Sequence, residues 1–543
     1  MTTTSSLSPH GPAHPPAHAH PEDHPLAGVK TSVSGKLLFL ALLLAGLAYG
    51  VIALTGDLSA AGANLQSWLP YALLGLALLI ALGFEFVNGF HDTANAVATV
   101  IYTNSLKPNV AVLWSGLFNF LGVLTSSGAV AFGILSLLPV ELILQVGSHS
   151  GFAMVFALLL SAIIWNLFTW WLGLPASSSH TLIGSIVGVG IANALMHGRD
   201  GTSGVDWTQV TKVGYSLFLS PVIGFVCAAL LLITVRYFVK APELYTAPKG
   251  KKAPPWWIRG LLVLTCTGVS FAHGSNDGQK GMGLIMLILV GTVPMAYSLN
   301  RAMPVDQSAV FVAMAEVTQR DLTRIAPAMA PADSQAVLSD YIRTHQMSDA
   351  LLPALAVVVG EIADQVKPYA SLAQIPNGAV ANVRNEMYLA SETIRVLGKS
   401  SVVLPAQAQI NLKALQKEMD KATKFIPLWV KVLVAIALGL GTMVGWKRIV
   451  VTVGEKIGKT HLTYAQGASA ELVAMATIGA ADAFGLPVST TQVLSSGVAG
   501  TMAASGTGLQ MGTLRSLLTA WVLTLPVALV LSGSLYWLLV QVF

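Results

Sequence analysis

Charged residues are scarce in this chain. Lys, Arg, Asp and Glu make up 10% of the 543 residues, whereas 54% are hydrophobic and the mean hydropathy is +0.67. A soluble protein of this length and composition would have too few polar groups to cover its surface. The composition therefore excludes an ordinary soluble protein and predicts a chain that crosses a membrane several times.

Cysteine is almost absent as well. Cys227 and Cys266 both fall in apolar segments, so they offer neither a disulfide framework nor the spacing of a metal site. The net charge of +5 does not indicate nucleic acid as a partner, since the basic residues flank apolar segments. The sequence shows no nucleophile paired with a base and no Gly-rich phosphate loop, so we expect neither an enzyme nor a bound cofactor.

The long apolar runs predict an all-α, multi-pass membrane protein with about twelve transmembrane segments, some of them broken helices or hairpins. The expected segments are 36–54, 70–88, 108–135, 151–172, 179–197, 213–237, 257–275, 281–298, 427–446, 464–484, 488–505 and 514–541. We expect the plasma membrane as the location, which is the inner membrane in a bacterium. An assembly of several copies is compatible with this composition.

The polar stretches divide the chain into six parts. We predict a disordered His- and Pro-rich tail at 1–35, a first membrane half at 36–240, a basic cytoplasmic loop at 241–256, the start of a second half at 257–298, a soluble helical insert at 299–425, and the rest of that half at 426–543.

The insert is recognised by its charge. It contains 12 of the 30 Lys and Arg residues and 12 of the 25 Asp and Glu residues, with charged and apolar positions alternating at helical spacing in 387–419. The basic loop before it is the clearest cytoplasmic candidate. Because two spans are expected between loop and insert, we expect the insert in the cytoplasm too.

Two polar motifs interrupt the apolar sequence, and each occurs twice. NGFHDTANA at 88–96 is answered by HGSNDGQKG at 273–281, and GLPASSSHT at 173–181 returns as GLPVSTTQ at 485–492. Duplicated halves with Gly- and Pro-broken polar stretches at matching places are typical of secondary transporters.

The first aspartate motif places four polar residues on one face of a helix. Glu85, Asn88, Asp92 and Asn95 are separated by three, four and three residues. Polar groups of this kind do not face lipid, so we expect them to face a cavity or a partner helix. We also expect Gly83 and Gly89 to loosen the helix there. A buried polar contact between helices is the alternative, and it is weakened by the recurrence of the motif at Asp277.

The hydroxyl motifs predict an anion site. Leu-Pro ends a helix, and the following Ser or Thr residues can cap a new one, whose N-terminus presents free N–H groups and a positive dipole end. Two such N-termini could enclose a tetrahedral oxyanion. Packing between helices is the alternative for a single motif. The expected phosphate ligands are Ser177, Ser178, Ser179, Thr181, Ser489, Thr490 and Thr491.

Further polar residues lie within apolar segments. Glu471 is a carboxylate placed upstream of the second hydroxyl motif, where a role in cation or proton coupling is the default interpretation. Asn119 and Gln492 are expected to support the site, and for Asn119 helix packing is as good an explanation.

With these residues in view, the chain resembles the PiT family of inorganic phosphate transporters, and more closely its bacterial low-affinity branch. The resemblance runs from about residue 36 to the C-terminus and rests on both pairs of motifs. It implies inverted-topology repeats, phosphate held between the hydroxyl motifs, and a coupling cation near the aspartate motifs.

The chain also departs from the sodium-coupled members. His91 precedes Asp92, and Lys280 stands where the first motif has Asn95, while Asn276 and Asp277 are retained. An ammonium beside a carboxylate can replace a bound monovalent cation, and a histidine can carry a proton. Gln492, where the family commonly has His, argues against an obligatory histidine carrier at that position.

We therefore expect symport of a divalent metal–hydrogenphosphate complex with protons, by alternating access. The metal, such as Mg²⁺ or Ca²⁺, would lie near Asp92 and Asp277, since carboxylates favour hard cations. The alternatives are a sodium-coupled phosphate symporter, a permease for another oxyanion such as sulfate, and a phosphate sensor that signals through the insert.

Overall fold

The computed structural model describes residues 26, 33–62, 68–135, 137, 148–248, 250, 252–327, 329, 331–400 and 402–542. For residues 92–94, 149 and 203 it describes the backbone alone. The predicted tail at 1–35 therefore lies outside the described residues, apart from Leu26 and 33–35.

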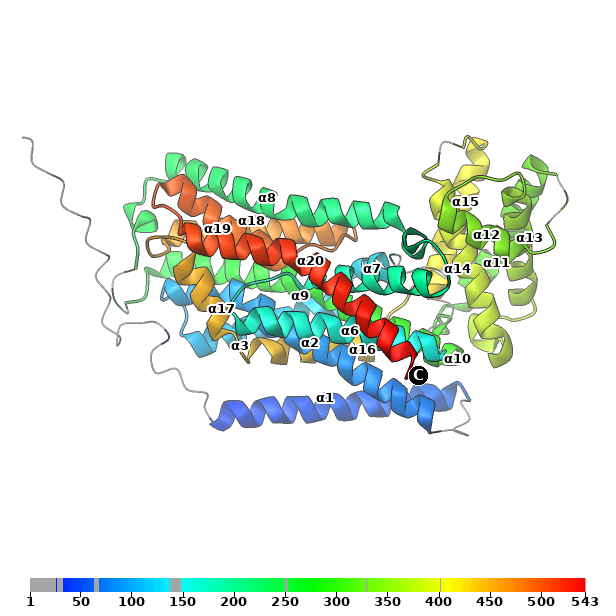
Figure 1. Cartoon of the computed structure of the whole chain (residues 1–543), viewed down its shortest axis with the longest axis horizontal. Helices are drawn as coiled ribbons and strands as arrows, with labels where there is room; N and C mark the ends of the chain where they lie inside the picture. Colours follow the sequence, from blue (N-terminus) through cyan, green and yellow to red (C-terminus); the bar gives the residue numbers. More distant parts are fainter. Residues whose placement is uncertain are drawn as a thin grey trace, which may run out of the picture.

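The described chain is built from helices, and the predicted all-α fold is confirmed (Figure 1). The helices of the larger body are α1 (Val33–Ala60), α2 (Leu69–Tyr102), α3 (Pro108–Thr125), α4 (Ala129–Leu135), α6 (His149–Trp171), α7 (Ser178–Met196), α8 (Trp207–Phe238), α9 (Trp256–Thr292), α10 (Pro294–Tyr297), α16 (Leu428–Thr442), α17 (Lys447–Val451), α18 (Tyr464–Ala483), α19 (Thr490–Ser505) and α20 (Met511–Val540).

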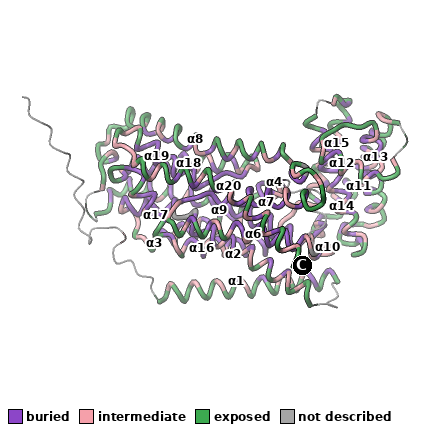
Figure 2. Tube along the Cα trace, in the orientation of Figure 1, coloured by how far each residue is buried: buried purple, intermediate pink, exposed green. Residues whose placement is uncertain are grey.

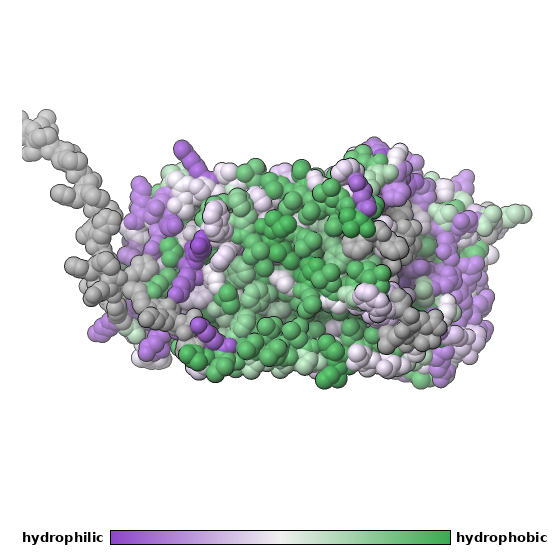
Figure 3. Space-filling model, turned by 60° about the horizontal axis from the view of Figure 1, so that its bottom comes forward, coloured by the Kyte–Doolittle hydropathy of each residue, from purple (hydrophilic) through white to green (hydrophobic). Residues whose placement is uncertain are grey.

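These helices make a membrane-embedded body. In the described residues seven helices are long and apolar enough to span a membrane, or eight if the bent pair at 406–442 counts as one span. The surface of the body is a broad apolar band with polar side chains towards both ends (Figure 3). The protein is thus a multi-pass membrane protein, and the number of twelve spans stays a prediction.

The insert is a separate bundle at one end of this body (Figure 1). Its helices are α11 (Val305–Ile325), α12 (Ser334–Thr344), α13 (Leu351–Val366), α14 (Asn377–Leu397) and α15 (Ala406–Thr423). They enclose a hydrophobic core of their own, with Phe311, Leu355 and Met387 among its buried members. The predicted helical character of the insert is confirmed.

One expectation about the insert is wrong. The segments 257–275 and 281–298, predicted as two spans, belong largely to one continuous helix, α9, since Gly278 and Gly281 do not break it. Arg259 at its start bonds the backbone oxygen of Ser105, and Tyr297 just beyond its end bonds Asp57. The insert and the basic loop before α9 therefore lie at opposite ends of the body, and not on the same side.

The body consists of two inverted repeats. The series α2, α3, α6, α7 and α8 corresponds to α9, α16, α18, α19 and α20. Arg259 of α9 bonds Ser105 just beyond the end of α2, whereas Gly281, further along α9, lies against Glu85 in the middle of α2. The two corresponding helices therefore run in opposite directions. This arrangement is the inverted topology expected of a secondary transporter.

The two repeats exchange packing partners. Helix α2 packs on α16 and α9 packs on α3, while α7 packs on α20 and α19 packs on α8. Accordingly the interior is buried, whereas α1 and the outer face of α8 are exposed along much of their length (Figure 2). Each repeat is thus completed by helices of the other.

Matching glycines of the two aspartate motifs lie at close helix crossings. A Cβ at Gly89 would collide with the backbone oxygen of Leu438 on α16, and one at Gly274 with that of Asn119 on α3. The expectation that Gly83 and Gly89 loosen the helix is wrong, because α2 is one continuous helix. Gly89 allows two backbones to touch.

Candidate functional site

Each hydroxyl motif forms the turn between two helices. Gly173 and Gly485 have φ of +71° and +64°, which end α6 and α18 in the left-handed conformation that favours glycine. Ser177 and Ser489 cap the next helices, since their hydroxyls accept the backbone N–H groups of the residues three positions later. The predicted capping of new helices by these motifs is confirmed.

The two turns meet inside the body. The Ser179 hydroxyl donates to the backbone oxygen of Val488 at 2.6 Å. Each turn is also held by the other repeat, as Trp521 of α20 bonds Pro175 and Ser216 of α8 bonds Pro487. The N-termini of α7 and α19 therefore come together at one place.

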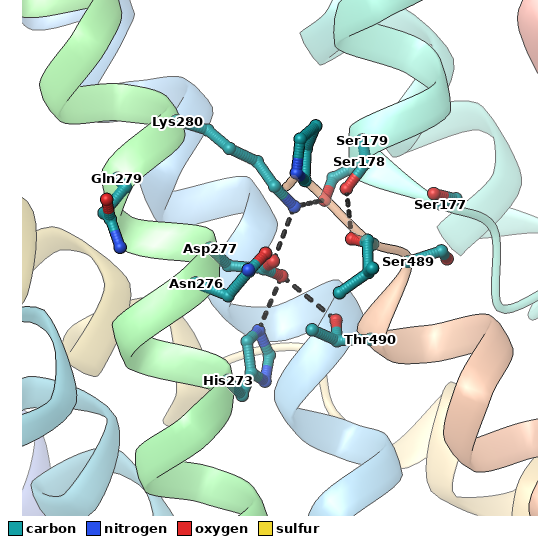
Figure 4. A network of polar contacts seen from close by, with 12 residues as sticks. Ser177, Ser178, Ser179, His273, Asn276, Asp277, Gln279, Lys280, Ser489 and Thr490 are labelled. Carbon is teal, nitrogen blue, oxygen red and sulfur yellow. Dashed lines mark hydrogen bonds and ion pairs between the residues drawn. The ribbon is translucent and has the colours of Figure 1, made fainter. Parts of the chain in front are cut away.

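The second aspartate motif lies against this meeting point (Figure 4). Asp277 accepts hydrogen bonds from Lys280 at 2.5 Å and from the Thr490 hydroxyl at 3.0 Å. The Nε2 atom of His273 lies 2.9 Å from the same carboxylate. Lys280 also lies 3.4 Å from the Ser178 hydroxyl. One cluster thus joins α9 to both hydroxyl turns.

The first aspartate motif reaches the same turns from α2. Asn95 donates to the Thr491 hydroxyl at 3.3 Å, and the His91 ring lies 3.1 Å from the hydroxyl of Thr169 on α6. The side chain of Asp92 lies outside the described residues. Both predicted motifs therefore contribute to one site, although His91 bonds a hydroxyl of α6.

The site is closed to solvent in this conformation. Ser178 is 2% exposed and Thr490 is 5% exposed, while Asp277 and Lys280 are completely buried. An anion held there would be surrounded by two helix N-termini, several hydroxyls and the Lys280 ammonium, which is paired with Asp277. These groups stabilise negative charge.

Some predicted site residues make contacts elsewhere. The Thr181 hydroxyl of α7 donates to Asn166 of α6, which holds these two helices together as the first hairpin. Asn276 donates to the backbone oxygen of Leu486 and so holds the second turn. The amide of Asn119 lies 3.5 Å from the Ser115 hydroxyl at the crossing of α3 with α9, and Gln492 lines a pocket between α8, α19 and α20.

Glu471 lies apart from the hydroxyl turns. It is completely buried on α18 and accepts hydrogen bonds from Thr99 of α2 and Thr265 of α9. Thr265 precedes Asp277 by twelve residues, which is about 18 Å along a helix. Its predicted role in coupling stays a prediction, and its contacts tie three helices together.

Two residues of the site were not among the predicted ligands. His273 lies four residues before Asp277, a spacing that could have placed it on the same helix face. Asp482, at the end of α18, accepts hydrogen bonds from Ser275 and Gln279. These bonds tie the second hairpin, formed by α18 and α19, to α9. No sequence signal paired Asp482 with these residues, because more than 200 positions separate them.

An enclosed polar site between two inverted repeats defines a secondary transporter. The comparison with family models agrees, since the model of the phosphate transporter family matches residues 88–532. The chain belongs to this family, as its motifs predicted, and it is a transporter and not an enzyme.

Individual relatives are similar to this chain over most of their length. The chain is 42% identical over 513 residues to the low-affinity inorganic phosphate transporter PitA of Escherichia coli K12, covering 89% of the chain and 99% of PitA. It is 42% identical over 490 residues to PitB of the same organism, covering 86% and 97%. Among solved structures, a sodium-dependent phosphate transporter matches with a TM-score of 0.49 and 20% identity, over 87% of this chain and 100% of that one.

Proposed function

We propose that the protein transports inorganic phosphate across the membrane. The observation that supports this most directly is the meeting of the α7 and α19 N-termini at the Ser179–Val488 contact. Relatives with 42% identity are named as low-affinity inorganic phosphate transporters, and the match covers nearly their whole length.

Phosphate would be held mainly by the first turns of α7 and α19. Ser177 and Ser489 already use their hydroxyls as caps, so the groups available to an anion are the backbone N–H groups and hydroxyls that follow them. These belong to Ser178, Ser179, Thr490 and Thr491. The Lys280 ammonium adds a positive charge next to Ser178.

The coupling ion would be a proton. Lys280 lies 2.5 Å from Asp277, so this carboxylate already has a cation supplied by the chain itself. A sodium ion bound there would compete with that ammonium. This contact supports proton coupling, as does the His91 ring in the buried first motif.

A divalent metal would travel with the phosphate as part of the substrate. A metal–hydrogenphosphate complex is neutral, and so it enters a buried site at a lower cost than a bare dianion. The metal would lie on the side of the aspartate motifs, with Asp92 and Asp277 as the ligands that we predict from the sequence. Rocking of the exchanged repeats would then open the site to either side of the membrane.

The test is uptake of radiolabelled phosphate into proteoliposomes, with imposed proton or sodium gradients and with or without Mg²⁺. Uptake that requires the proton gradient and the metal would support the full proposal. Sodium-driven uptake that is indifferent to metal would exclude the proton and metal parts. Uptake of sulfate in place of phosphate would exclude phosphate as the substrate.

The sensor alternative predicts a different result for the insert. Deletion of residues 305–423 should leave uptake largely intact if the protein is a transporter. If the protein is chiefly a sensor, the deletion should abolish its output and leave phosphate binding unchanged.

A further inference from the structure

Glu85 is a buried carboxyl group that forms no ion pair with any residue of the described chain. It lies on α2, seven residues before Asp92 and on the same helix face, and it is completely buried. Neither of its oxygens accepts a hydrogen bond of normal geometry from the described residues. Both amide atoms of Asn88, one turn further along, are also buried without a bond.

Such a group cannot stay ionised without compensation. Removing an unpaired carboxylate from water costs several kcal/mol or more, and inside a membrane such residues mark ion or proton pathways. Glu85 therefore needs either a proton or a bound cation.

The surroundings of Glu85 come mainly from α9. The described groups that act on the Glu85 carboxyl are the Asn88 amide, the backbone N–H of Gly281, and the charges of Lys280 and Asp277. Helices α3, α6, α16, α17, α18 and α19 and the turn Thr452–Lys456 also pack against α2. Their described Lys, Arg, Asp and Glu residues are Lys431, Lys447, Arg448, Glu455, Lys456, Glu471 and Asp482. Lys431 bonds Ser126, Glu471 bonds Thr99 and Asp482 bonds Ser275, and the charges that act on Glu85 are those of Lys280 and Asp277. His149 of α6 and Asp92 of α2 itself have no described side chain.

A proton fits these surroundings better than a metal ion. A Cβ at Gly281 would collide with the Glu85 carboxyl, so this group lies directly against the α9 backbone. The groups around it are N–H donors and an ammonium, whereas hard cations require several oxygen ligands. The described groups beside Glu85 therefore suit a proton better than a metal ion.

We propose that Glu85 is the residue that binds the co-transported proton, an assignment that rests on the proposed proton-coupled phosphate transport. When Glu85 is ionised, Asp277 and Lys280 compensate each other, and Glu85 adds a negative charge that this ion pair does not compensate. That charge repels the phosphate oxygens of the neutral metal–hydrogenphosphate complex when they approach the two hydroxyl turns. A proton from the solution on one side of the membrane binds a Glu85 carboxyl oxygen and neutralises the charge. The proton dissociates again after the site has opened to the other side of the membrane.

Proton and phosphate binding are then linked. Because a proton on Glu85 favours phosphate binding, bound phosphate favours the proton by the same free energy. Because of this linkage, the loaded transporter contains both a proton and a phosphate, as symport requires.

The decisive variant is Glu85→Gln, which keeps the side-chain size and imitates the protonated form. We would reconstitute it and measure two rates. The first is exchange of labelled external phosphate for internal phosphate at equal pH, and the second is accumulation driven by a pH gradient. The expected result is that exchange continues while accumulation and the pH dependence of apparent phosphate affinity are lost.

A binding measurement without transport complements these rates. In weakly buffered detergent solution with a pH indicator, the unaltered protein should take up about one proton per bound phosphate near the pH where Glu85 titrates. Glu85→Gln should bind phosphate without this uptake. Asp340→Asn, which removes an exposed carboxylate of the insert, is the matched control and should behave as the unaltered protein does.

Three outcomes would overturn the assignment. They are pH-driven accumulation by Glu85→Gln, loss of exchange in this variant when it remains folded, and an unchanged pH profile in Glu85→Asp, which keeps the acid but shortens it. If the unaltered protein does not respond to a pH gradient, proton coupling itself is wrong and this assignment falls with it.

Discussion

The ammonium of Lys280 and the carboxylate of Asp277 form an ion pair of 2.5 Å in which both side chains are completely shielded from solvent. The pair occupies one turn of α9, in the middle of the second aspartate motif. It is the closest charge contact at the site, so removal of Lys280 leaves the Asp277 carboxylate without its ammonium, and removal of Asp277 leaves the ammonium without this carboxylate.

The first prediction concerns this pair. Lys280→Gln should abolish transport and lower stability by about 3–5 kcal/mol, because it leaves a buried unpaired carboxylate. The double variant Lys280→Gln, Asp277→Asn should recover most of the stability without recovering transport. Thermal unfolding in detergent and phosphate uptake together measure both effects. A double variant as unstable as Lys280→Gln would contradict this account of the pair.

The second prediction separates two threonines that the sequence placed in one group. Thr490→Val removes a hydroxyl that bonds Asp277 at the site, so apparent phosphate affinity should fall about tenfold, corresponding to one lost hydrogen bond. Thr181→Val removes a bond to Asn166 within the first hairpin, so it should lower stability more than affinity. Concentration-dependent uptake and thermal unfolding of both variants distinguish these effects. Equal losses of affinity would mean that Thr181 also binds phosphate.

The third prediction concerns the crossing of α2 with α16. Gly89→Leu should force the two backbones apart and reduce both stability and transport, since even a Cβ would collide with the oxygen of Leu438. Gly75→Leu is the control on the same helix, because a Cβ there meets nothing within 4 Å. Detergent-extracted yield and uptake are the measurements. A tolerated Gly89→Leu would show that this crossing is loose in the membrane.

The fourth prediction is the sidedness of the insert. The loops at the far end of the body contact one another and contain Lys107, Lys252, Lys456 and Lys459 among their basic residues. Basic loops favour the cytoplasm, so the insert should lie on the opposite, external side. In a Cys227→Ala background, an impermeant maleimide added to intact cells should label Met329→Cys and not Lys252→Cys. The reverse pattern would place the insert in the cytoplasm.

Local chemistry accounts for what could be predicted from the sequence. The Ser177 and Ser489 caps follow from Leu-Pro and hydroxyl residues within a few positions, and the charge of the insert separates it from the apolar body. The aspartate motifs were located because polar residues recur at helical spacing in apolar sequence. Each of these features is decided within about one helical turn or by composition.

The features that could not be predicted depend on contacts distant in sequence. A glycine can either loosen a helix or allow another helix to pack closely. For Gly89, only the position of Leu438 in the folded protein shows that close packing is its role. The division of 257–298 into two segments was wrong, because Gly278 and Gly281 are tolerated when the helix is enclosed by others. The pairing of Asp482 with Ser275 and Gln279 likewise needed the complete arrangement.

The exchange of partners between the repeats also has a consequence for biosynthesis. Helix α7 is complete at Met196, but its packing partner α20 begins only at Met511, about 300 residues later. At 5–20 residues per second, the ribosome needs roughly 15 to 60 seconds to cover that interval. During this time the hairpin of α6 and α7 lacks the helix that covers it in the folded protein. The insertion machinery or lipid must therefore cover that surface until α20 has been made.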